Sequence, residues 1–371
     1  MKKSILFYLV LLFSFSVYAQ REKKDVFAPE YVRNIMLKTV RWQFSNPYHG
    51  ARDWTNAAFY AGAFAAWEVT GENEIYDKLM SIGQNLRWRP ARRWYHADDI
   101  AVCQNYIDLY RTVGKREMIQ PTIDTLALFI SRPYPAKKKA VEVIKLWWCD
   151  ALFMAPPVFV KLGITLNNPI YLEFSDIYFK EAYDLLYDNN EKLFFRDLNY
   201  VVRNDKRNLL EANGKPIYWS RGNGWVMGGL VRILQELPAD YKMRSFYESL
   251  FKEMASRVIE LQQKDGLWRA SLLDPESYPG GEVSGSGFFC YALAWGINNG
   301  FLDAAEYQPV VEKAWKYLST VALQPDGKIG YVQPIGEKAI PGQVVDANST
   351  SNFGVGAFLL AACERVRYLN K

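Results

Sequence analysis

The feature that most constrains the fold is a regular alternation of short and long connections between helical segments. Apolar residues recur at helical spacing along nearly the whole 371-residue chain, with almost no strict alternation. The pattern predicts twelve helices, over residues 28–44, 54–70, 73–87, 97–113, 117–130, 147–162, 167–188, 221–236, 240–263, 284–299, 303–321 and 350–369. A long connection rich in Gly, Pro, Asn and Asp precedes every second helix, and short connections follow these helices. The chain is therefore predicted to form six helical hairpins whose long loops open on one face.

The second helix of each predicted hairpin is rich in small residues. Residues 57–66 are mostly alanine, and residues 222–229 and 284–287 carry several glycines. Because small side chains let helices approach closely, we expect these helices to form an inner ring. The predicted fold class is all-α, an (α/α)6 barrel or six-hairpin toroid, with residues 20–371 as one catalytic domain. An open solenoid would show a clearer repeat, and two separate bundles would need a linker. Long loops usually carry function, so the loop face is the predicted active face.

Composition and the N-terminus limit the classes of protein that fit. Residues 1–19 combine Lys2, Lys3, an apolar run and Ala19, which is typical of a secretory signal peptide. We therefore expect an exported protein, periplasmic or secreted, and no later apolar run is long enough to predict a membrane span. The net charge of +5 is spread along the chain, which argues against a nucleic-acid partner.

The supply of metal-ligating residues is small. The chain has two histidines, His49 and His96, and its four cysteines lack CxxC spacing. We expect the cysteines to be buried apolar residues, and we expect no metal site and no cofactor. The oligomeric state is predicted to be a monomer or a weak homo-oligomer.

Asp150 is a lone carboxylate in an apolar run, residues 146–157, that has no other charged side chain. A carboxylate in such surroundings either finds a partner or raises its pKa until it is protonated. A carboxylic acid that stays neutral at working pH is a proton donor, so Asp150 is a candidate catalytic acid. The alternative is that Asp150 caps a helix or pairs with a buried arginine.

Other polar and aromatic residues stand at the starts of the predicted inner helices, where a toroid would bring them together. The candidates for a pocket are Asn56, His96, Asp98, Asp99, Trp148, Trp219, Arg221 and Trp225. Tryptophan rings beside charged groups are typical of sugar sites. A second carboxylate near Asp150, either Asp98 or Asp99, would hold its pKa up by repulsion. Taken singly, Asp53, Asp98 and Ser284 also fit helix capping.

Arg221 lies between two tryptophans at a glycine-flanked helix start, where backbone N–H groups also favour an anion. It is therefore a candidate partner for a substrate carboxylate. The alternative is an internal ion pair with Asp150 or Glu282.

Three segments in matching order carry a family resemblance: residues 148–154 (WCDALFM), 219–225 (WSRGNGW) and 282–289 (EVSGSGFF). They resemble glycoside hydrolase family 105, the unsaturated glucuronyl and rhamnogalacturonyl hydrolases, which is related to family 88. The resemblance implies an (α/α)6 barrel that removes the terminal 4,5-unsaturated uronic acid from lyase-generated, anionic oligosaccharides. It implies that Asp150 is the acid and base, that Asp98 is the second aspartate, and that no metal takes part.

The chain departs from many members of that family in having no histidine after His96. The region around residues 189–218 offers Lys206, Arg207 and Glu211 instead. The resemblance therefore leaves two sources of substrate open, rhamnogalacturonan fragments and ulvan fragments whose sulfated rhamnose would meet these basic groups. Lys137 to Lys139 are candidates for the same role, with ordinary solvated charges as the alternative.

Two other classes of function compete with the hydrolase. A non-catalytic glycan-binding protein would have little use for both Asp98 and Asp150. A sugar epimerase would normally use histidines as acid and base, and this chain has only two.

Overall fold

The structure, a computed structural model, describes residues 25–132, 144–202, 209–336 and 341–369. The predicted signal peptide, Lys137 to Lys139, Lys206 and Arg207 lie outside the described residues.

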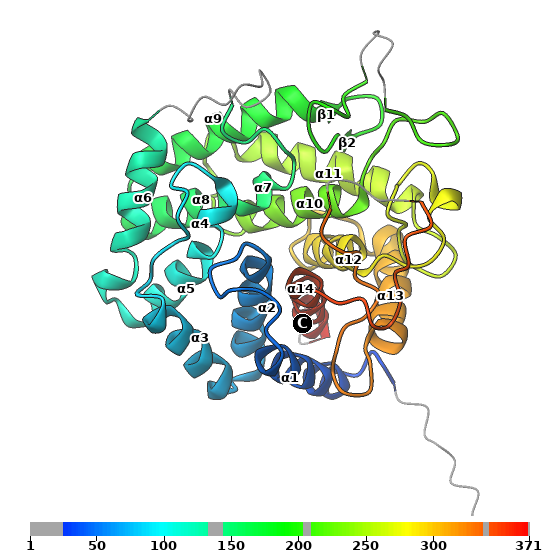
Figure 1. Ribbon diagram of the computed structural model, residues 1–371, viewed down its shortest axis with the longest axis horizontal. Helices are drawn as coiled ribbons and strands as arrows, with labels where there is room; N and C mark the ends of the chain where they lie inside the picture. Colours follow the sequence, from blue (N-terminus) through cyan, green and yellow to red (C-terminus); the bar gives the residue numbers. More distant parts are fainter. Residues whose placement is uncertain (1–24, 133–143, 203–208, 337–340, 370–371) are drawn as a thin grey trace, which may run out of the picture.

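The described helices form two concentric rings, seen end-on in Figure 1. The inner ring consists of α2 (Thr55–Thr70), α5 (Cys103–Val113), α8 (Pro156–Leu166), α10 (Ser220–Leu234), α12 (Val283–Asn298) and α14 (Asn352–Leu369). Each of these helices contacts the next, and α14 contacts α2, so the ring is closed. The outer ring consists of α1 (Pro29–Ser45), α3 (Asn73–Asn85), α6 (Gln120–Ser131), α9 (Pro169–Leu186), α11 (Arg244–Glu260) and α13 (Ala304–Tyr317). The predicted six-hairpin toroid is confirmed.

Short elements complete the described part of the chain. Two helical turns lead into inner helices: α4 (Ala97–Ile100) before α5, and α7 (Ala151–Met154) before α8. The others are the 3-10 helices η1 (Arg116–Met118) and η3 (Pro275–Ser277) and the π-helical turn η4 (Leu318–Ala322). Strands β1 (Tyr187–Asp188) and β2 (Leu193–Phe194) form one antiparallel hairpin, with Tyr187 opposite Phe194.

The structure corrects the boundaries of two inner helices. The helix predicted over 147–162 begins only at Ala151 and breaks at Ala155, because Pro156 and Pro157 lack the N–H groups that would continue α7. Proline suits the first turn of a helix, so α8 begins there. The helix predicted over 97–113 is likewise divided, into α4 and α5. These breaks lie next to Asp98 and Asp150.

Close approach of backbones explains the small residues of the inner ring. A Cβ on Gly356 of α14 would lie 2.3 Å from the carbonyl carbon of Ala58 in α2. A Cβ on Gly229 of α10 would lie 2.4 Å from the carbonyl oxygen of Leu152. No larger residue fits at either position without moving a helix, so the glycines set the diameter of the ring.

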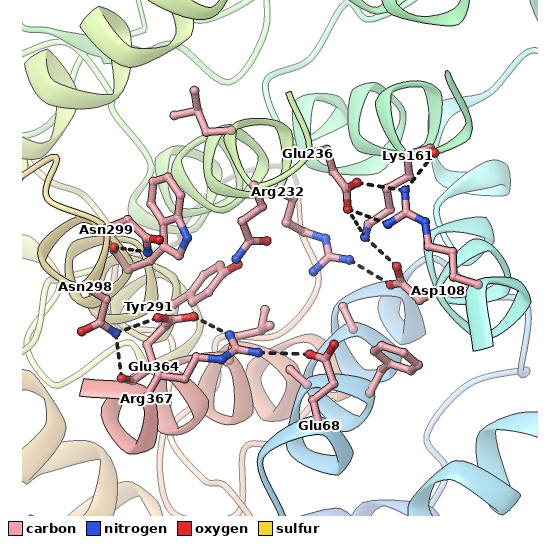
Figure 2. A pocket seen from close by; sticks show the side chains of 18 of the residues that line it. Glu68, Asp108, Lys161, Arg232, Glu236, Tyr291, Asn298, Asn299, Glu364 and Arg367 are labelled. Carbon is pink, nitrogen blue, oxygen red and sulfur yellow. Dashed lines mark hydrogen bonds and ion pairs between the residues drawn. The ribbon is translucent and has the colours of Figure 1, made fainter. Parts of the chain in front are cut away.

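The two ends of the toroid differ in chemistry. The C-terminal ends of the inner helices surround a cavity of about 1420 Å³ lined by charged side chains, shown in Figure 2. Lys161 bonds to Asp108 and Glu236, at 2.6 Å and 2.8 Å, and Arg111 also bonds to Glu236. Although burial opposes it, these cations lower the pKa of Glu236 to about 2. The charges here satisfy one another, so this cavity is not the predicted active site, which lies at the N-terminal ends of the inner helices.

A second group of ion pairs lies on the opposite side of the same cavity (Figure 2). Arg367 bonds to Glu364 and Glu68, and Asn298 donates to the Glu364 carboxylate at 2.8 Å. Paired charges of both signs line this end, and they join α2, α12 and α14. The main effect of these ion pairs and hydrogen bonds is to tie the C-terminal ends of neighbouring helices together.

Candidate active site

Asp98 and Asp150 come from the two short turns that precede inner helices. Asp98 is the second residue of α4, and Asp150 is the residue before α7. The two turns contact each other. Asp150 makes no capping hydrogen bond with its side chain, so the capping alternative does not apply to it. The two helix breaks therefore bring the two predicted catalytic carboxyl groups to one place.

Both carboxyl groups are pushed toward the protonated form. Burial, and then the charge of Asp150, raise the pKa of Asp98 from 3.8 to about 7. Burial also raises the pKa of Asp150, against the opposing charges of Arg196 and Arg221. Two carboxyl groups that repel each other in a poorly hydrated place retain a proton near neutral pH. The pair has the electrostatic character of a proton donor.

His96 and Trp148 connect the two turns. The ring of His96 lies 4.8 Å from the ring of Trp148. His96 Nδ1 accepts a hydrogen bond from the backbone N–H of Asp98 at 3.3 Å and lies 3.6 Å from the Asp98 carboxylate. The histidine therefore holds the start of α4 against the residues that precede Asp150. Its predicted contact with substrate stays a prediction.

Arg221 is almost fully buried, with 1% of its surface exposed. Its guanidinium donates to the carbonyl oxygens of Gln333, at 2.8 Å, and Pro334, at 3.2 Å. Burial lowers its pKa to about 10 against the nearby charges of Glu282 and Asp150. Within the described parts of the chain no ion pair joins Arg221 to either carboxylate. The alternative of an internal ion pair is therefore not what the structure shows.

The two tryptophans of the 219–225 segment lie differently. Trp219 is 4% exposed, its Nε1 donates to Gln333 at 2.8 Å, and its ring lies 4.2 Å from the Arg221 guanidinium. Trp225 is 1% exposed and packs against Phe153 and Phe288. Trp225 thus packs in the core, and its predicted contact with substrate stays a prediction.

Asp99 and Asn56 hold loops in place. Asp99 accepts hydrogen bonds from the backbone N–H and the guanidinium of Arg93, and so ties down the loop before α4. Asn56 donates to the carbonyl of Gly50 at 3.0 Å and accepts from Asn352 at 2.9 Å. Both ends of the Asn56 amide are therefore engaged within the protein. Of the two neighbouring aspartates, Asp98 is the one coupled to Asp150.

The capping expectations have mixed outcomes. Asp53 accepts from the backbone N–H and the hydroxyl of Thr55 at the start of α2, which confirms its capping role. At the start of α12 the cap is Glu282, which accepts from the N–H groups of Ser284 and Gly285, while Ser284 acts as a donor. Glu282 is therefore occupied by its own helix.

Arg196 and Asp197 belong to this site but were not found from the sequence. The backbone N–H of Cys149 donates to the carbonyl of Arg196 at 2.8 Å, and Trp148 and Asp197 form an antiparallel bridge. Arg196 is ion-paired with the fully buried Asp197. The only signal in the sequence is an Arg-Asp pair after a short hydrophobic run, which is too common to single out. A tertiary contact across about 50 positions brings this pair to Asp150.

The remaining features of the described residues concern cysteines, metal ligands and membrane spans. The four cysteines are free and buried, as predicted. The described residues include no cluster of three or more His, Cys, Asp or Glu that would hold a metal ion. No helix within them has both the length and the apolarity that crossing a membrane requires.

Function follows from the site rather than from the fold. Two carboxyl groups that keep a proton near neutral pH, with aromatic rings and arginines around them, are typical of enzymes that act on glycosides. A family model described as Glycosyl Hydrolase Family 88 matches residues 29–369, so the chain belongs to that family and is a glycoside hydrolase. The sequence resemblance, which pointed to family 105 and its relative family 88, is thereby confirmed at the level of this group of enzymes.

Individual relatives span nearly the whole chain. An "Unsaturated 3S-rhamnoglycuronyl hydrolase" of Formosa agariphila is 44% identical over 338 residues, covering 89% of this chain and 89% of its own. A solved family 88 glycosyl hydrolase from Bacteroides vulgatus is 38% identical, with a TM-score of 0.83 over 92% of this chain and 99% of its own. A solved structure described as a polysaccharide lyase is 44% identical, with a TM-score of 0.84 over 92% of this chain and 98% of its own.

Proposed function

We propose that the protein removes the terminal 4,5-unsaturated uronic acid from lyase-generated oligosaccharides by hydrating the C4=C5 double bond. The observation that carries the proposal is the carboxyl pair of Asp98 and Asp150: burial raises the pKa of both groups, and the charge of Asp150 raises that of Asp98 further, to about 7. Membership of glycosyl hydrolase family 88 supports it.

The proposed reaction starts with proton transfer from the Asp150 carboxyl group to C4. Positive charge then develops at C5, shared with the ring oxygen, and water adds at C5 while the Asp150 carboxylate takes the water's proton. The C5 hemiketal opens by breaking its bond to the ring oxygen, and the hemiacetal left at C1 releases the saccharide. Asp150 thus returns to its starting state, while Asp98 keeps the pKa of Asp150 high through repulsion.

The proposed substrate carries a 3-sulfated rhamnose next to the unsaturated uronate. The support is the 44% identical relative whose name specifies a 3S-rhamnoglycuronyl substrate. Arg221 is proposed to hold the uronate carboxylate, with Trp148 and Trp219 against the sugar rings. The buried Arg221 Nε, which no acceptor reaches within the described residues, supports a missing anionic partner.

The setting of the enzyme is also proposed. The signal-like composition of residues 1–19 supports export to the periplasm or outside the cell. We propose a single catalytic domain after this segment, acting as a monomer or weak homo-oligomer.

Ultraviolet absorbance of the unsaturated uronate tests the reaction. Incubation with oligosaccharides from an ulvan-type lyase should abolish this absorbance, whereas a lyase acting on intact polysaccharide would increase it. The Asp150→Asn variant should lose about 10²–10⁴-fold in rate, the usual contribution of a general acid. Full activity of this variant, or a rise in absorbance with the native enzyme on polysaccharide alone, would refute the proposal. Parallel assays with pectin-derived fragments test whether the enzyme prefers substrates that carry a sulfated rhamnose.

A further inference from the structure

Arg196 occupies a fixed position beside the catalytic acid. Its carbonyl accepts from the N–H of Cys149, the residue before Asp150, and the next residue along, Asp197, forms a β-bridge with Trp148. These contacts place the Arg196 backbone directly against the turn that presents Asp150. The side chain is 17% exposed, so the cation is partly withdrawn from water.

The charge of the Arg196 guanidinium acts on the site. Of the charged groups that act on Asp150, Arg196 has the largest effect and Arg221 the next. The positive charge of Arg196 also lowers the pKa of Arg221. Two guanidinium groups therefore flank the carboxyl group that is proposed to protonate C4.

Both guanidinium groups have hydrogen-bonding capacity that the protein does not use. Arg196 uses one nitrogen to bond Asp197, and among the described residues the acceptors for Arg221 are two carbonyl oxygens. The Nε atoms of both arginines are buried without an acceptor anywhere in the described chain. A buried donor without a partner is rare in folded proteins, and two beside one acid indicate an acceptor that arrives with a ligand.

The position of Arg196 beside Asp150 indicates which group of the substrate accepts its hydrogen bonds. In the unsaturated uronate the carboxylate is carried on C5, the neighbour of the carbon that receives the proton. A guanidinium that faces Asp150 is thus within reach of that carboxylate, whereas the leaving sugar is attached across the ring at C1. We propose that Arg196 is a second carboxylate-binding residue, which together with Arg221 holds the uronate from two sides. This inference rests on the proposed function.

A comparison of charged and neutral substrates tests the inference. The unsaturated disaccharide and its uronate methyl ester are assayed with the native enzyme, Arg196→Gln and Arg196→Lys. Because a hydrogen bond to a charged group is worth about 10- to 150-fold, Arg196→Gln should lower kcat/KM for the acid by roughly that factor. For the ester the loss should be under about threefold, since the ester lacks the charge. Arg196→Lys should fall between, because it keeps the charge without the fork of donors.

Other outcomes overturn the inference. An equal loss on acid and ester would mean that Arg196 acts through Asp150 alone. A loss that instead follows the presence of sulfate on the leaving sugar would place Arg196 at that sulfate. If the native enzyme consumed neither substrate, the proposed function itself would fail, which is a distinct result.

Two further variants keep the test valid. Arg196→Gln leaves the buried Asp197 without its ion pair, so the double variant Arg196→Gln/Asp197→Asn restores a neutral pair and should show the same preference between acid and ester. Arg257→Gln is the matched control. Arg257 is 23% exposed and pairs with Glu191 of the same loop, but on the outer helix α11. This control should leave the ratio of kcat/KM for the acid to kcat/KM for the ester unchanged.

Discussion

Replacing Asp98 by asparagine should make the protein more stable at alkaline pH while making it a poorer enzyme. The physical reason is that Asp98 is 20% exposed and lies beside a second acid, so its ionised form is unfavourable in the folded state. Asparagine has nearly the same shape and cannot ionise. The variant therefore removes an electrostatic cost that the folded enzyme carries when Asp98 ionises beside Asp150.

The sign and size follow from the pKa of Asp98, which burial and Asp150 raise from 3.8 to about 7 in the folded state. A folded-state pKa above the unfolded one means that the favourable contribution is present below pH 3.8 and is lost as the pH rises toward 7. Over that range the native protein loses about 1.4 kcal/mol per pH unit relative to the variant. Between pH 5 and pH 7 the advantage of Asp98→Asn should grow by roughly 2 kcal/mol, because the slope falls as the pH reaches the folded-state pKa.

Urea unfolding of both proteins at pH 5, 6, 7 and 8 measures this quantity. The difference in unfolding free energy should rise steadily to pH 7 and then level off. Asp77→Asn, on the exposed surface of the outer helix α3, controls for the loss of one negative charge. A difference that stays constant across the series would refute the argument that Asp98 is held protonated by its surroundings.

The same variant tests the coupling of the two acids. If the charge of Asp98 opposes ionisation of Asp150, as proposed, the alkaline limb of the kcat/KM profile should move to lower pH in this variant. An unchanged alkaline limb would separate the stability effect from catalysis and show that Asp98 does not tune Asp150.

Two predictions concern the scaffold. Lys161→Met removes the cation that Asp108 and Glu236 share and leaves them Arg232 and Arg111 as partners. It should therefore lower the unfolding free energy in urea by less than the about 3–5 kcal/mol of a fully unpaired buried charge, with kcat of the folded fraction unchanged. Gly356→Ala places a methyl group 2.3 Å from the backbone of Ala58, which should cost at least about 1–3 kcal/mol by overpacking and lower the thermal midpoint. A thermal midpoint equal to that of the native protein would show that the ring of inner helices can widen.

The architecture could be predicted because loop lengths and small residues are local features of the sequence. Alternating connections specify which end of each hairpin carries the long loops, and glycines such as Gly356 mark where backbones meet. The helix breaks before α5 and α8 were missed, although Pro156 and Pro157 were visible in the sequence. Apolar periodicity continues across such a break, because both pieces pack on the same core.

The site was predictable where a residue was chemically out of place in its surroundings. Asp150 stood out as one charge in an apolar run, and Arg221 as one cation among glycines and tryptophans. Arg196 did not stand out, because its importance comes from the β-bridge that carries it to Cys149. The choice between Asp98 and Asp99 could not be made from the sequence, because neighbouring residues of a helical turn point in different directions. In the structure Asp98 is the one coupled to Asp150.

The helix dipoles and the pairing of charges differ between the two ends of the inner ring, which suits one end to catalysis and the other to stability. All six inner helices begin at the long-loop face, so their partial positive N-terminal ends converge there and favour an anionic substrate. At that end the enzyme keeps unused guanidinium donors and a carboxyl pair with a retained proton. At the opposite end the C-terminal carbonyls would favour unpaired cations, and there each of Lys161, Arg111 and Arg367 is neutralised by carboxylates. The fold tolerates unsatisfied charges at one end because the ion-pair network at the other end stabilises the same helices.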